Sequence, residues 1–419
     1  MIPKPPRALG IDVGSSGVRI AALDEDGRTC ALAAERYRNA AQRDDPAAWW
    51  RGVEACLEDL TRKVSLQDIA AVAVDGTSGT VLALDGAGAP LGRALMYDVA
   101  CPDPHVTALL EAIAPAESPA RGKHSALARA AFLARQPAVA RVVHQADWIA
   151  MQLGGGPVSD ENNALKTGYD LTARRWPDWI AKLGLDPAIL PEVVPAGTVL
   201  CPVGEKARTF GLPASAVIVS GTTDGCASFL ATGAGDVGDG VTALGSTLVL
   251  KLLSDREINA PAYGIYSHRI AGMWLAGGAS NTGGAVIRAY FPDDRLAELT
   301  ERLNPDRPTG LDYYPLLRPG ERFPVNDPAL APRLDPRPSD DAVFFQGLLE
   351  GIAAVEAQGY ARLSELGAPA LRAVRSVGGG AANAAWMRIR QRRLGVPFLQ
   401  AASTEAAAGT ARLALRALS

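Results

Sequence analysis

Two aspartates far apart in the chain, Asp12 and Asp224, give the clearest chemical signal in this sequence. Each follows an apolar run and lies beside glycine, serine or threonine, so we expect each carboxylate at the end of a strand, next to a turn. Phosphoryl transfer to an alcohol needs a carboxylate that accepts the hydroxyl proton, a metal on the phosphates and many N–H donors. Asp224 suits the first of these requirements and Asp12 the second.

Asp12 precedes a short turn between two apolar runs, which is the pattern of a β-hairpin. Gly14 and Gly17 let the backbone turn without a Cβ penalty and let a ligand approach closely. Ser15 and Ser16 add hydroxyl groups beside exposed backbone N–H groups, a combination suited to phosphate. Asp12 could hold Mg²⁺ through water, because Mg²⁺ prefers oxygen ligands. The alternative is an ordinary hairpin whose aspartate caps the turn.

Asp224 lies in the segment Gly-Thr-Thr-Asp-Gly, after an apolar strand expected at residues 216–220 and at the start of a helix. This position suits a carboxylate at the floor of a cleft that accepts a proton from a substrate hydroxyl. Helix capping is the alternative, although Thr222 and Thr223 could cap the helix instead.

Four Gly/Ser/Thr turns, each at the end of a strand, indicate two lobes that hold phosphates and a nucleotide. The chain has no Gly-x-x-x-x-Gly-Lys-[Ser/Thr] segment, and no Gly-x-Gly-x-x-Gly opens its first helix, which argues against P-loop and Rossmann sites. The spacing around Ser16 and Ser78 argues against a hydrolase nucleophile. The four turns are Gly14–Gly17, Gly76–Gly79, Gly245–Thr247 and Gly378–Gly380.

The helix start after the last of these turns is expected to cradle the nucleotide together with Gly379 and Gly380. Asn383 and Trp386 would bound the adenine pocket. Core packing is the alternative role for Trp386. The residues expected to meet the phosphates are Gly14, Ser15, Ser16, Gly245, Ser246 and Thr247.

A sugar would lie near the turn at residues 76–79. Asp75 and Ser78 could face it, although Asp75 could equally pin its own turn. The segment Glu161–Asn163 and Lys166 could also touch a substrate. A solvated loop is the simpler interpretation of that polar segment, and we expect a loop over residues 157–169.

Composition limits the class of protein. The chain has 419 residues, which is too long for one core and predicts two domains. Hydrophobic residues make up 48%, charged residues 21%, and the net charge is −3, so we expect neither a nucleic-acid nor a membrane partner. Five scattered cysteines and four scattered histidines argue against disulfides or a zinc site and favour a cytoplasmic location.

The elements that position these residues predict an α/β protein. Three antiparallel strands, a helix capped by Asp45 with Pro46 at its first position, and a buried strand at residues 69–74 open an actin-like (ribonuclease-H-like) domain. A second hairpin at residues 235–253 suggests an internal duplication. We expect two actin-like ATPase domains hinged over a central cleft. They are a sugar-binding domain at 1–231, to which a helix at 405–419 returns, and a nucleotide-binding domain at 232–404.

The remaining segments are less informative. Residues 102–155 are alanine-rich and read as mostly helical, and residues 305–338, rich in proline, aspartate and arginine, read as a long surface loop. A long helix is expected at residues 342–367 and a last helix at 404–418, with Thr404 as its N-cap.

With these residues in view, the chain resembles the FGGY family of carbohydrate kinases over essentially its full length. Within the family it is most similar to the short D-ribulose kinase branch of plants and cyanobacteria, through residues 74–81, 145–148 with 163–169, and 310–316. The motifs that carry the family resemblance are Gly-Ile-Asp-Val-Gly-Ser-Ser-Gly (10–17), Gly-Thr-Thr-Asp-Gly (221–225), Leu-Gly-Ser-Thr (244–247), Gly-Gly-Gly-Ala-Ala-Asn (378–383) and Thr-Glu-Ala-Ala-Ala-Gly-Thr-Ala (404–411).

The resemblance implies ATP and Mg²⁺ as cosubstrates, Asp224 as general base, and Asp12 near the metal and the transferred phosphate. The sugar-binding serine of the branch falls on Ser78, where typical xylulose kinases carry Gln-Met-His in place of Gly76–Ser78. We therefore expect ATP-dependent phosphorylation of the terminal hydroxyl of D-ribulose, giving D-ribulose 5-phosphate and ADP, by a monomer or weak homodimer. Asp12, Ser78 and Asp224 would bind the sugar.

Two alternatives remain open at this point. The first is the same chemistry on another ketopentose or polyol, such as D-xylulose. The second is an actin-like ATPase that acts as a chaperone or sugar sensor, which sugar-independent ATP hydrolysis would favour.

Overall fold

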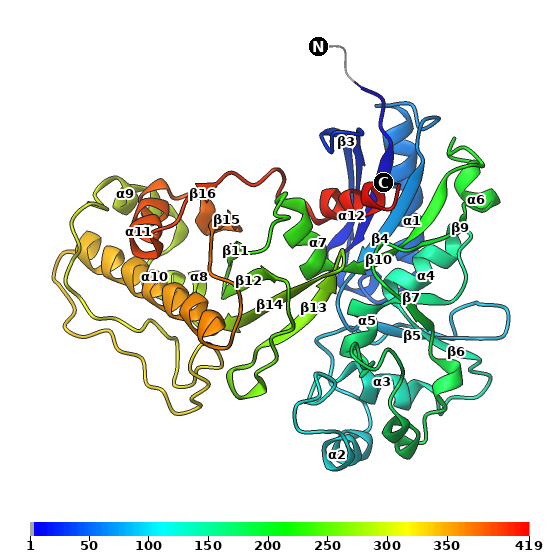
Figure 1. Ribbon diagram of the computed structural model, residues 1–419, viewed down its shortest axis with the longest axis horizontal. Coiled ribbons are helices and arrows are strands. Elements are labelled where there is room, and N and C mark those ends of the chain that lie inside the picture. Colours follow the sequence, from blue (N-terminus) through cyan, green and yellow to red (C-terminus); the bar gives the residue numbers. More distant parts are fainter. Residues whose placement is uncertain (1–3, 419) are drawn as a thin grey trace. The chain divides into compact units, whose positions relative to one another are not determined.

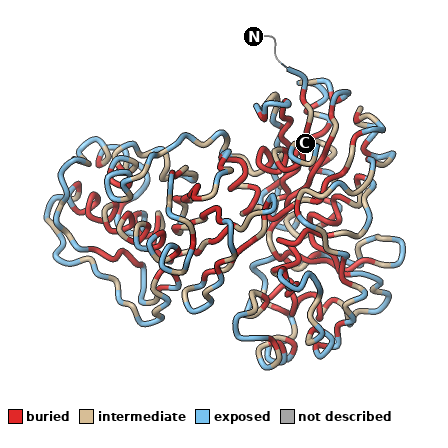
Figure 2. Tube along the Cα trace, viewed as in Figure 1, coloured by how far each residue is buried: buried red, intermediate tan, exposed pale blue. Residues whose placement is uncertain are grey.

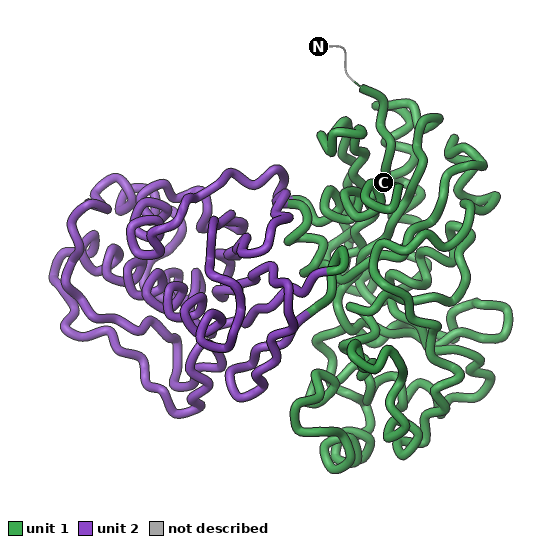
Figure 3. The backbone as a smooth tube through the Cα atoms, in the orientation of Figure 1, with its two compact units in different colours: residues 1–231, 268–272, 405–419 green, residues 232–267, 273–404 purple. Residues whose placement is uncertain are grey.

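The chain divides into two compact units (Figure 3) in a computed structural model that describes residues 4–418. Unit 1 holds the chain up to Ala231, residues 268–272, and the chain from Glu405 onward. Unit 2 holds residues 232–267 and 273–404. The short return to unit 1 at 268–272 has no counterpart in the division expected from the sequence.

Unit 1 is built on a six-stranded mixed sheet with the order β3-β2-β1-β4-β10-β9. Strand β1 pairs antiparallel with β2 and parallel with β4, and β4 pairs parallel with β10. Residues that end these parallel strands therefore meet at one edge, the edge where open α/β sheets bind ligands. The strands are β1 (Ala8–Val13), β2 (Gly17–Leu23), β3 (Thr29–Arg36), β4 (Ala71–Gly76), β9 (Val199–Pro202) and β10 (Val217–Thr223).

The rest of unit 1 consists of helices and two short two-stranded sheets. Asp45 caps the first helix and Pro46 begins it, which confirms the prediction. The loop expected at 157–169 is wrong, because a strand and a buried helix occupy it. The helices are α1 (Pro46–Thr61), α2 (Pro104–Ile113), α3 (Ala126–Leu133), α4 (Gln145–Gln152), α5 (Glu161–Lys166), α6 (Glu205–Arg208), α7 (Asp224–Ala231) and α12 (Ala406–Arg416), and the extra strands are β5 (Val81–Leu84), β6 (Arg141–His144), β7 (Val158–Asp160) and β8 (Glu192–Val194).

Small residues set how closely the last helix lies on the sheet. One sheet face carries large apolar side chains against α1 and α4, whereas mostly alanines, together with Gly10, Leu23 and Val219, line the face beneath α12. Helix α12 is the red helix beside this sheet in Figure 1. A Cβ at Gly10 would lie 2.0 Å from the Ala407 carbonyl oxygen, and one at Gly409 would lie 1.8 Å from that of Ala227. A larger side chain at either glycine would push α12 away from β1 or from α7. The helix begins at Ala406 with Glu405 at its N-cap, so the prediction of Thr404 as cap was wrong.

Unit 2 repeats the strand pattern of unit 1. Its sheet has the order β13-β14-β12-β11-β15-β16, in which β11 pairs antiparallel with β12 and parallel with β15. The hairpin β11–β12 thus stands where β1–β2 stands in unit 1, as the suggested duplication requires. The strands are β11 (Asp239–Leu244), β12 (Leu248–Ser254), β13 (Tyr266–Ile270), whose residues 268–270 are counted in unit 1, β14 (Met273–Ser280), β15 (Ala373–Val377) and β16 (Phe398–Leu399).

The long helix α10 forms the core of unit 2 together with the sheet (Figure 2). Residues 305–338 contain no helix or strand, but Tyr313, Leu316 and Phe323 are buried in that core, so the segment is not wholly a surface loop. Side chains of a long loop can complete a core when no regular element does. The helices are α8 (Gly284–Tyr290), α9 (Asp293–Glu301), α10 (Asp341–Glu365) and α11 (Ala384–Leu394), and short 3₁₀ segments lie at Ala40–Gln42, Asp178–Leu183, Pro187–Ile189, Pro261–Tyr263 and Gly379–Ala382.

In the part of the chain that the structure describes, none of the helices has the length and apolar character that crossing a membrane requires. All five cysteines are free thiols.

Candidate active site

Three aspartates meet at the carboxyl edge of the unit 1 sheet. Asp12 is the next-to-last residue of β1 and Asp75 of β4, and the two lie opposite each other in register. Asp224 directly follows β10, whose Thr223 lies opposite Gly76. Asp12 is 5% exposed and Asp75 is fully buried.

Two carboxyl groups of this cluster have a raised pKa. Burial raises the pKa of Asp12 to about 6, with a further contribution from the charge of Asp224 and opposing ones from the hydrogen bond with Asp75 and from Arg19. Burial, followed by the charge of Asp12, also raises the pKa of Asp75 well above its usual value. Arg19 lies 3.4 Å from Asp12, and its side chain is 36% exposed. Within residues 4–418 it is the cation that pairs with Asp12, and none pairs with Asp75.

Asp75 is held by the last helix and not by its own turn. The Thr410 hydroxyl on α12 donates a hydrogen bond to Asp75 Oδ2, while Oδ1 is buried and has no donor among the described residues. The pKa of Asp75 is raised, and its other neighbour is the Asp12 carboxylate. A proton on Asp75 would therefore make a hydrogen bond to Asp12 and hold that side chain in place.

The turn that carries Ser78 is fixed from two sides. Gln145 Oε1 accepts hydrogen bonds from the Thr77 backbone N–H (2.9 Å) and from its hydroxyl (2.8 Å). Arg129 donates to the Gly79 carbonyl oxygen at 2.6 Å. The Ser78 hydroxyl between them is buried and has no partner among the described residues. Sequence reasoning assigned no site role to either side chain. Arg129 is the one polar residue of α3, and Gln145 was noted only within the segment 145–148 that carries part of the resemblance.

Helix α5 is buried against the strand that precedes Asp224, so a solvated loop is wrong for this segment. Asn162 Nδ2 donates to the Thr222 hydroxyl (3.0 Å), and Asn163 Nδ2 donates to the Thr222 carbonyl (3.2 Å). Burial raises the pKa of Glu161 to about 7. Lys166, at the end of α5, lies beside the Ser78 turn, since a Cβ at Gly79 would be 4.0 Å from its Cβ.

The first hairpin ends in a turn suited to phosphate. The Gly14 N–H donates to the Gly17 carbonyl at 3.0 Å and closes the turn. Ser15 and Ser16 are exposed, and their backbone N–H groups donate to no group in residues 4–418. Two free N–H groups and two hydroxyls beside Asp12 form the kind of concave donor set that binds anions.

Unit 2 carries a second turn of this kind between β11 and β12. Ser246 is exposed, and the carbonyls of Gly245 and Ser246 accept hydrogen bonds from Gly284 (2.9 Å) and Ala285 (3.0 Å) at the start of α8. These two hydrogen bonds tie the turn to the start of α8.

The glycine turn after β15 leads into α11. Asn383 is the N-cap, with Oδ1 accepting from the Trp386 N–H at 2.9 Å and Nδ2 donating to the Thr300 hydroxyl at 3.0 Å. Trp386 is 3% exposed and packs against Gly380, where a Cβ would lie 2.4 Å from the indole ring. Core packing, the alternative given for Trp386, therefore describes its side chain well. Gly379 beside it is exposed.

The predicted site residues thus form one group in each unit. The unit 1 group is Asp12, Gly14, Ser15, Ser16, Ser78 and Asp224, and the unit 2 group is Gly245, Ser246, Thr247, Gly379, Gly380, Asn383 and Trp386.

The residues present fit a nucleotide-bound Mg²⁺ better than a metal held by protein alone. In the described residues, no group of three or more His, Cys, Asp or Glu side chains is arranged to hold a metal ion. Mg²⁺ commonly takes one or two carboxylates and completes its shell with water and phosphate oxygens. Asp12, with one carboxylate beside free N–H groups, supplies a donor set of that kind.

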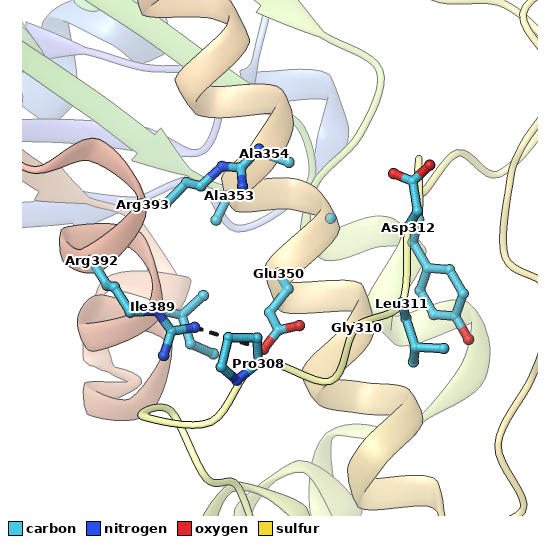
Figure 4. A pocket seen from close by; sticks show the side chains of 12 residues that line it. Pro308, Gly310, Leu311, Asp312, Glu350, Ala353, Ala354, Ile389, Arg392 and Arg393 are labelled. Carbon is cyan, nitrogen blue, oxygen red and sulfur yellow. Dashed lines mark ion pairs between the residues drawn. The ribbon is translucent and has the colours of Figure 1, made fainter.

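A cavity of about 630 Å³ lies in unit 2 between α10, α11 and the segment at 308–313 (Figure 4). None of the predicted site residues lines it. Its acidic groups are engaged within the protein, because Glu350 accepts from the Thr309 hydroxyl (2.6 Å) and Asp312 from Arg333 (2.8 Å). We assign it no role in the chemistry of the cluster in unit 1.

Comparison with known proteins gives two family matches, one in each half of the chain. Sequence models of the N-terminal and C-terminal domains of the FGGY family of carbohydrate kinases match residues 7–115 and 238–418. The chain belongs to the FGGY family of carbohydrate kinases. Its Asp12 hairpin lies in the first matched range, and its β11–β12 hairpin and glycine turn lie in the second.

Relatives within the FGGY family are distant in sequence. The chain is 26% identical to the erythritol kinase of Brucella abortus over 98% of its own length and 87% of that protein's. It is 25% identical to the xylulose kinase of Escherichia coli over 64% of its length, and that match spans 58% of the relative. The structure of a xylulose kinase from Lactobacillus acidophilus superposes with a TM-score of 0.82 at 19% identity, covering 98% of this chain and 89% of that one. This likeness shows the two-domain actin-like fold.

Proposed function

We propose that this protein phosphorylates the terminal hydroxyl of a small sugar with ATP, and that D-ribulose is that sugar. The observation that carries the proposal is the cluster of Asp12, Asp75 and Asp224 at the carboxyl edge of three parallel strands, beside a turn with free N–H groups. Asp12 and Asp75 are buried with one partly exposed arginine at 3.4 Å from Asp12, and buried acids with so little cationic compensation are unfavourable for stability and are commonly kept for chemistry. Membership of a carbohydrate kinase family supports that chemistry.

Asp224 acts as the general base in this mechanism. It accepts the proton of the substrate hydroxyl as the oxygen attacks the γ-phosphorus of ATP. Its Oδ1 also accepts a hydrogen bond from the Gly225 N–H at 2.7 Å, which fixes the direction of the carboxylate. The free N–H groups of Ser15 and Ser16 offset charge on the phosphoryl oxygens.

Asp12 would help to hold and orient the metal ion that accompanies the phosphates. Mg²⁺, when bound with ATP, would neutralise phosphate charge. Asp12 has its pKa raised to about 6, so it is ionised at neutral pH and can hold a water ligand of the metal. Asp75, held by Thr410, keeps the Asp12 side chain in place.

D-Ribulose is proposed on the turn at residues 76–79. Ser78 offers a buried hydroxyl without a partner, which suits a substrate oxygen. D-Xylulose and the polyol erythritol are the second candidates, because the relatives in the comparison carry those names. Neither relative is similar enough to decide the substrate.

A panel of sugars tests the proposal. ADP release coupled to NADH oxidation would be followed with MgATP and D-ribulose, D-xylulose, L-ribulose or erythritol. We expect the highest kcat/KM for D-ribulose. A higher value for another sugar would change the proposed substrate but keep the proposed sugar kinase activity. Sugar-independent ATP hydrolysis alone would contradict the sugar kinase activity.

A further inference from the structure

The turn at residues 76–79 depends on one side chain of helix α4, Gln145. Its backbone N–H donates to the Thr80 carbonyl at 3.2 Å, and its Oε1 accepts from the Thr77 N–H and hydroxyl. Gln145 therefore holds both ends of the segment that carries Ser78. Gly76 leaves the room for this contact, because a Cβ there would lie 3.1 Å from Oε1.

The other end of the Gln145 carboxamide has no partner. Gln145 is 1% exposed, and its Nε2 is buried without an acceptor among the described residues. The Thr77 backbone N–H can only donate, so the carboxamide cannot be turned over to exchange the two atoms. An NH₂ group that carries two donors thus remains beside the turn with nothing to receive them.

Ser78, on the turn itself, also has a polar group without a hydrogen-bond partner. Its hydroxyl is buried and has no partner, although the residues on both sides of it are fixed by Gln145 and Arg129. Buried polar groups in folded proteins nearly always have partners, and those without one often mark a ligand site. Two buried polar groups thus lack hydrogen-bond partners, the Ser78 hydroxyl on the turn and the Gln145 NH₂ group beside it. Together they indicate a ligand rich in oxygen atoms.

We propose that Gln145 Nε2 donates a hydrogen bond to an oxygen of the sugar and acts with the Ser78 hydroxyl as a substrate-specificity residue. This inference rests on the proposed sugar kinase function and adds a residue to its substrate site. An NH₂ group only donates, whereas a hydroxyl donates and accepts. The pair therefore recognises two neighbouring oxygens of a ketose or polyol, and discriminates against an analogue that lacks the oxygen facing Gln145.

The substitution Gln145→Glu separates the two functions of this side chain. It keeps a carboxyl oxygen for the Thr77 N–H and hydroxyl but replaces the NH₂ donor by a second oxygen. We expect the KM for the sugar to rise about 10-fold to 100-fold, as for loss of one buried hydrogen bond, while the KM for ATP stays within about 2-fold. Gln145→Met removes both functions and should lower kcat as well.

A matched control lies at the other end of the same helix. Gln152 accepts from Lys206 at 2.8 Å, so Gln152→Glu makes the same change away from the turn and should leave both KM values unchanged. A second readout uses substrates that lack one hydroxyl each. For the analogue without the oxygen that Gln145 contacts, wild type and Gln145→Glu should have the same KM.

The outcomes separate this inference from the proposed function. Direct binding of D-ribulose, D-xylulose and erythritol to the wild-type chain would be measured by calorimetry without ATP, beside the turnover assay. An unchanged sugar KM in Gln145→Glu, with a raised KM only in Gln145→Met, would show that Gln145 merely holds the turn and would overturn the inference alone. If the wild type neither binds nor phosphorylates any of these sugars, both proposals fail.

Discussion

One cluster of buried charged side chains in each unit can be compared, and the two clusters differ in how fully their charges are compensated. In unit 2, Arg390 and Glu356 are fully buried and form a two-pronged ion pair, with both N–O distances at 2.6 Å. Thr242 donates to Glu356 and Arg390 donates to Ser376, so the pair is further satisfied. In unit 1, Asp12 and Asp75 are buried with one partly exposed arginine at 3.4 Å from Asp12.

This difference separates a structural charge from one that we propose to be catalytic. A buried ion pair with all its hydrogen bonds made joins elements, here β11, β15, α10 and α11, and has little left to offer a ligand. The two buried carboxyls of the unit 1 cluster have a raised pKa, chiefly because of burial, and their charge weakens the fold, which is a common condition of groups kept for chemistry. Neutralising one charge should therefore have opposite effects on stability in the two units.

The largest effect is expected when the proposed base is removed. Asp224→Ala should lower kcat by about 10²-fold to 10⁴-fold, because a general base contributes that much, while the affinity for MgATP is retained. Steady-state assays with saturating sugar and a nucleotide-binding titration would measure both quantities. Asp178→Ala, which removes an aspartate 87% exposed in unit 1, is the control and should be fully active. Near-normal turnover of Asp224→Ala would refute the assignment.

Breaking the ion pair of unit 2 should give the largest loss of stability. Glu356→Gln leaves the Arg390 charge buried without a counter-ion, which is expected to lower the free energy of unfolding by about 3–5 kcal/mol. Denaturant unfolding followed by circular dichroism would measure the change. The double variant Glu356→Gln/Arg390→Met should recover part of it. A loss below about 1 kcal/mol would mean that the pair is not the structural element described here.

The ionised Asp12 carboxylate should destabilise the fold, in contrast to Glu356, and this effect should depend on pH. The pKa of Asp12 is about 6 in the folded chain, against 3.8 for a free aspartate side chain, so the folded state binds the proton more tightly. Stability therefore falls as pH rises from about 4 to 6 and stays lower above that, by up to about 3 kcal/mol for this shift. Asp12→Asn should match the wild type near pH 4 and exceed it at pH 7. Parallel stability curves for the two proteins would contradict the predicted shift.

The smallest effect is expected from the contact between α12 and Asp75. Thr410→Val removes the hydroxyl that donates to Asp75 and keeps the side-chain volume. We expect a loss of about 1 kcal/mol in stability, together with a fall in kcat larger than the change in either KM. Thr410→Ser keeps the hydroxyl and should restore kcat. Equal kcat in all three proteins would show that Asp75 does not need this contact.

Local patterns made much of the fold predictable. The β1–β2 hairpin, the Asp45–Pro46 start of α1 and the hairpin β11–β12 follow from apolar runs, glycine turns and capping residues within a few positions. Helix α5 could not be found in this way, because it is short and polar. The buried amides of Asn162 and Asn163 are satisfied in large part by residues far along the chain, since Thr222 accepts from both and the Arg269 backbone bonds to Asn162.

The site was predictable as single residues but not as a network. Asp12, Ser78 and Asp224 stand in glycine-rich motifs that suggest ligand contact. The partner of Asp75 lies 335 positions away on α12, and no local pattern relates the two. Gln145 was visible only as part of a resemblance, since its meaning depends on the turn that it holds. Long-range pairing of this kind depends on the packing of glycines such as Gly10 against α12, which a single sequence does not display.

The most direct test neutralises one buried carboxylate in each unit with an isosteric amide. The free energy of unfolding and kcat would be measured at pH 7 for the wild type, Asp12→Asn and Glu356→Gln. We predict that Asp12→Asn unfolds at higher denaturant than the wild type and loses kcat at least about 100-fold, whereas Glu356→Gln unfolds at lower denaturant. An Asp12→Asn protein that is less stable than the wild type and still fully active would contradict the account.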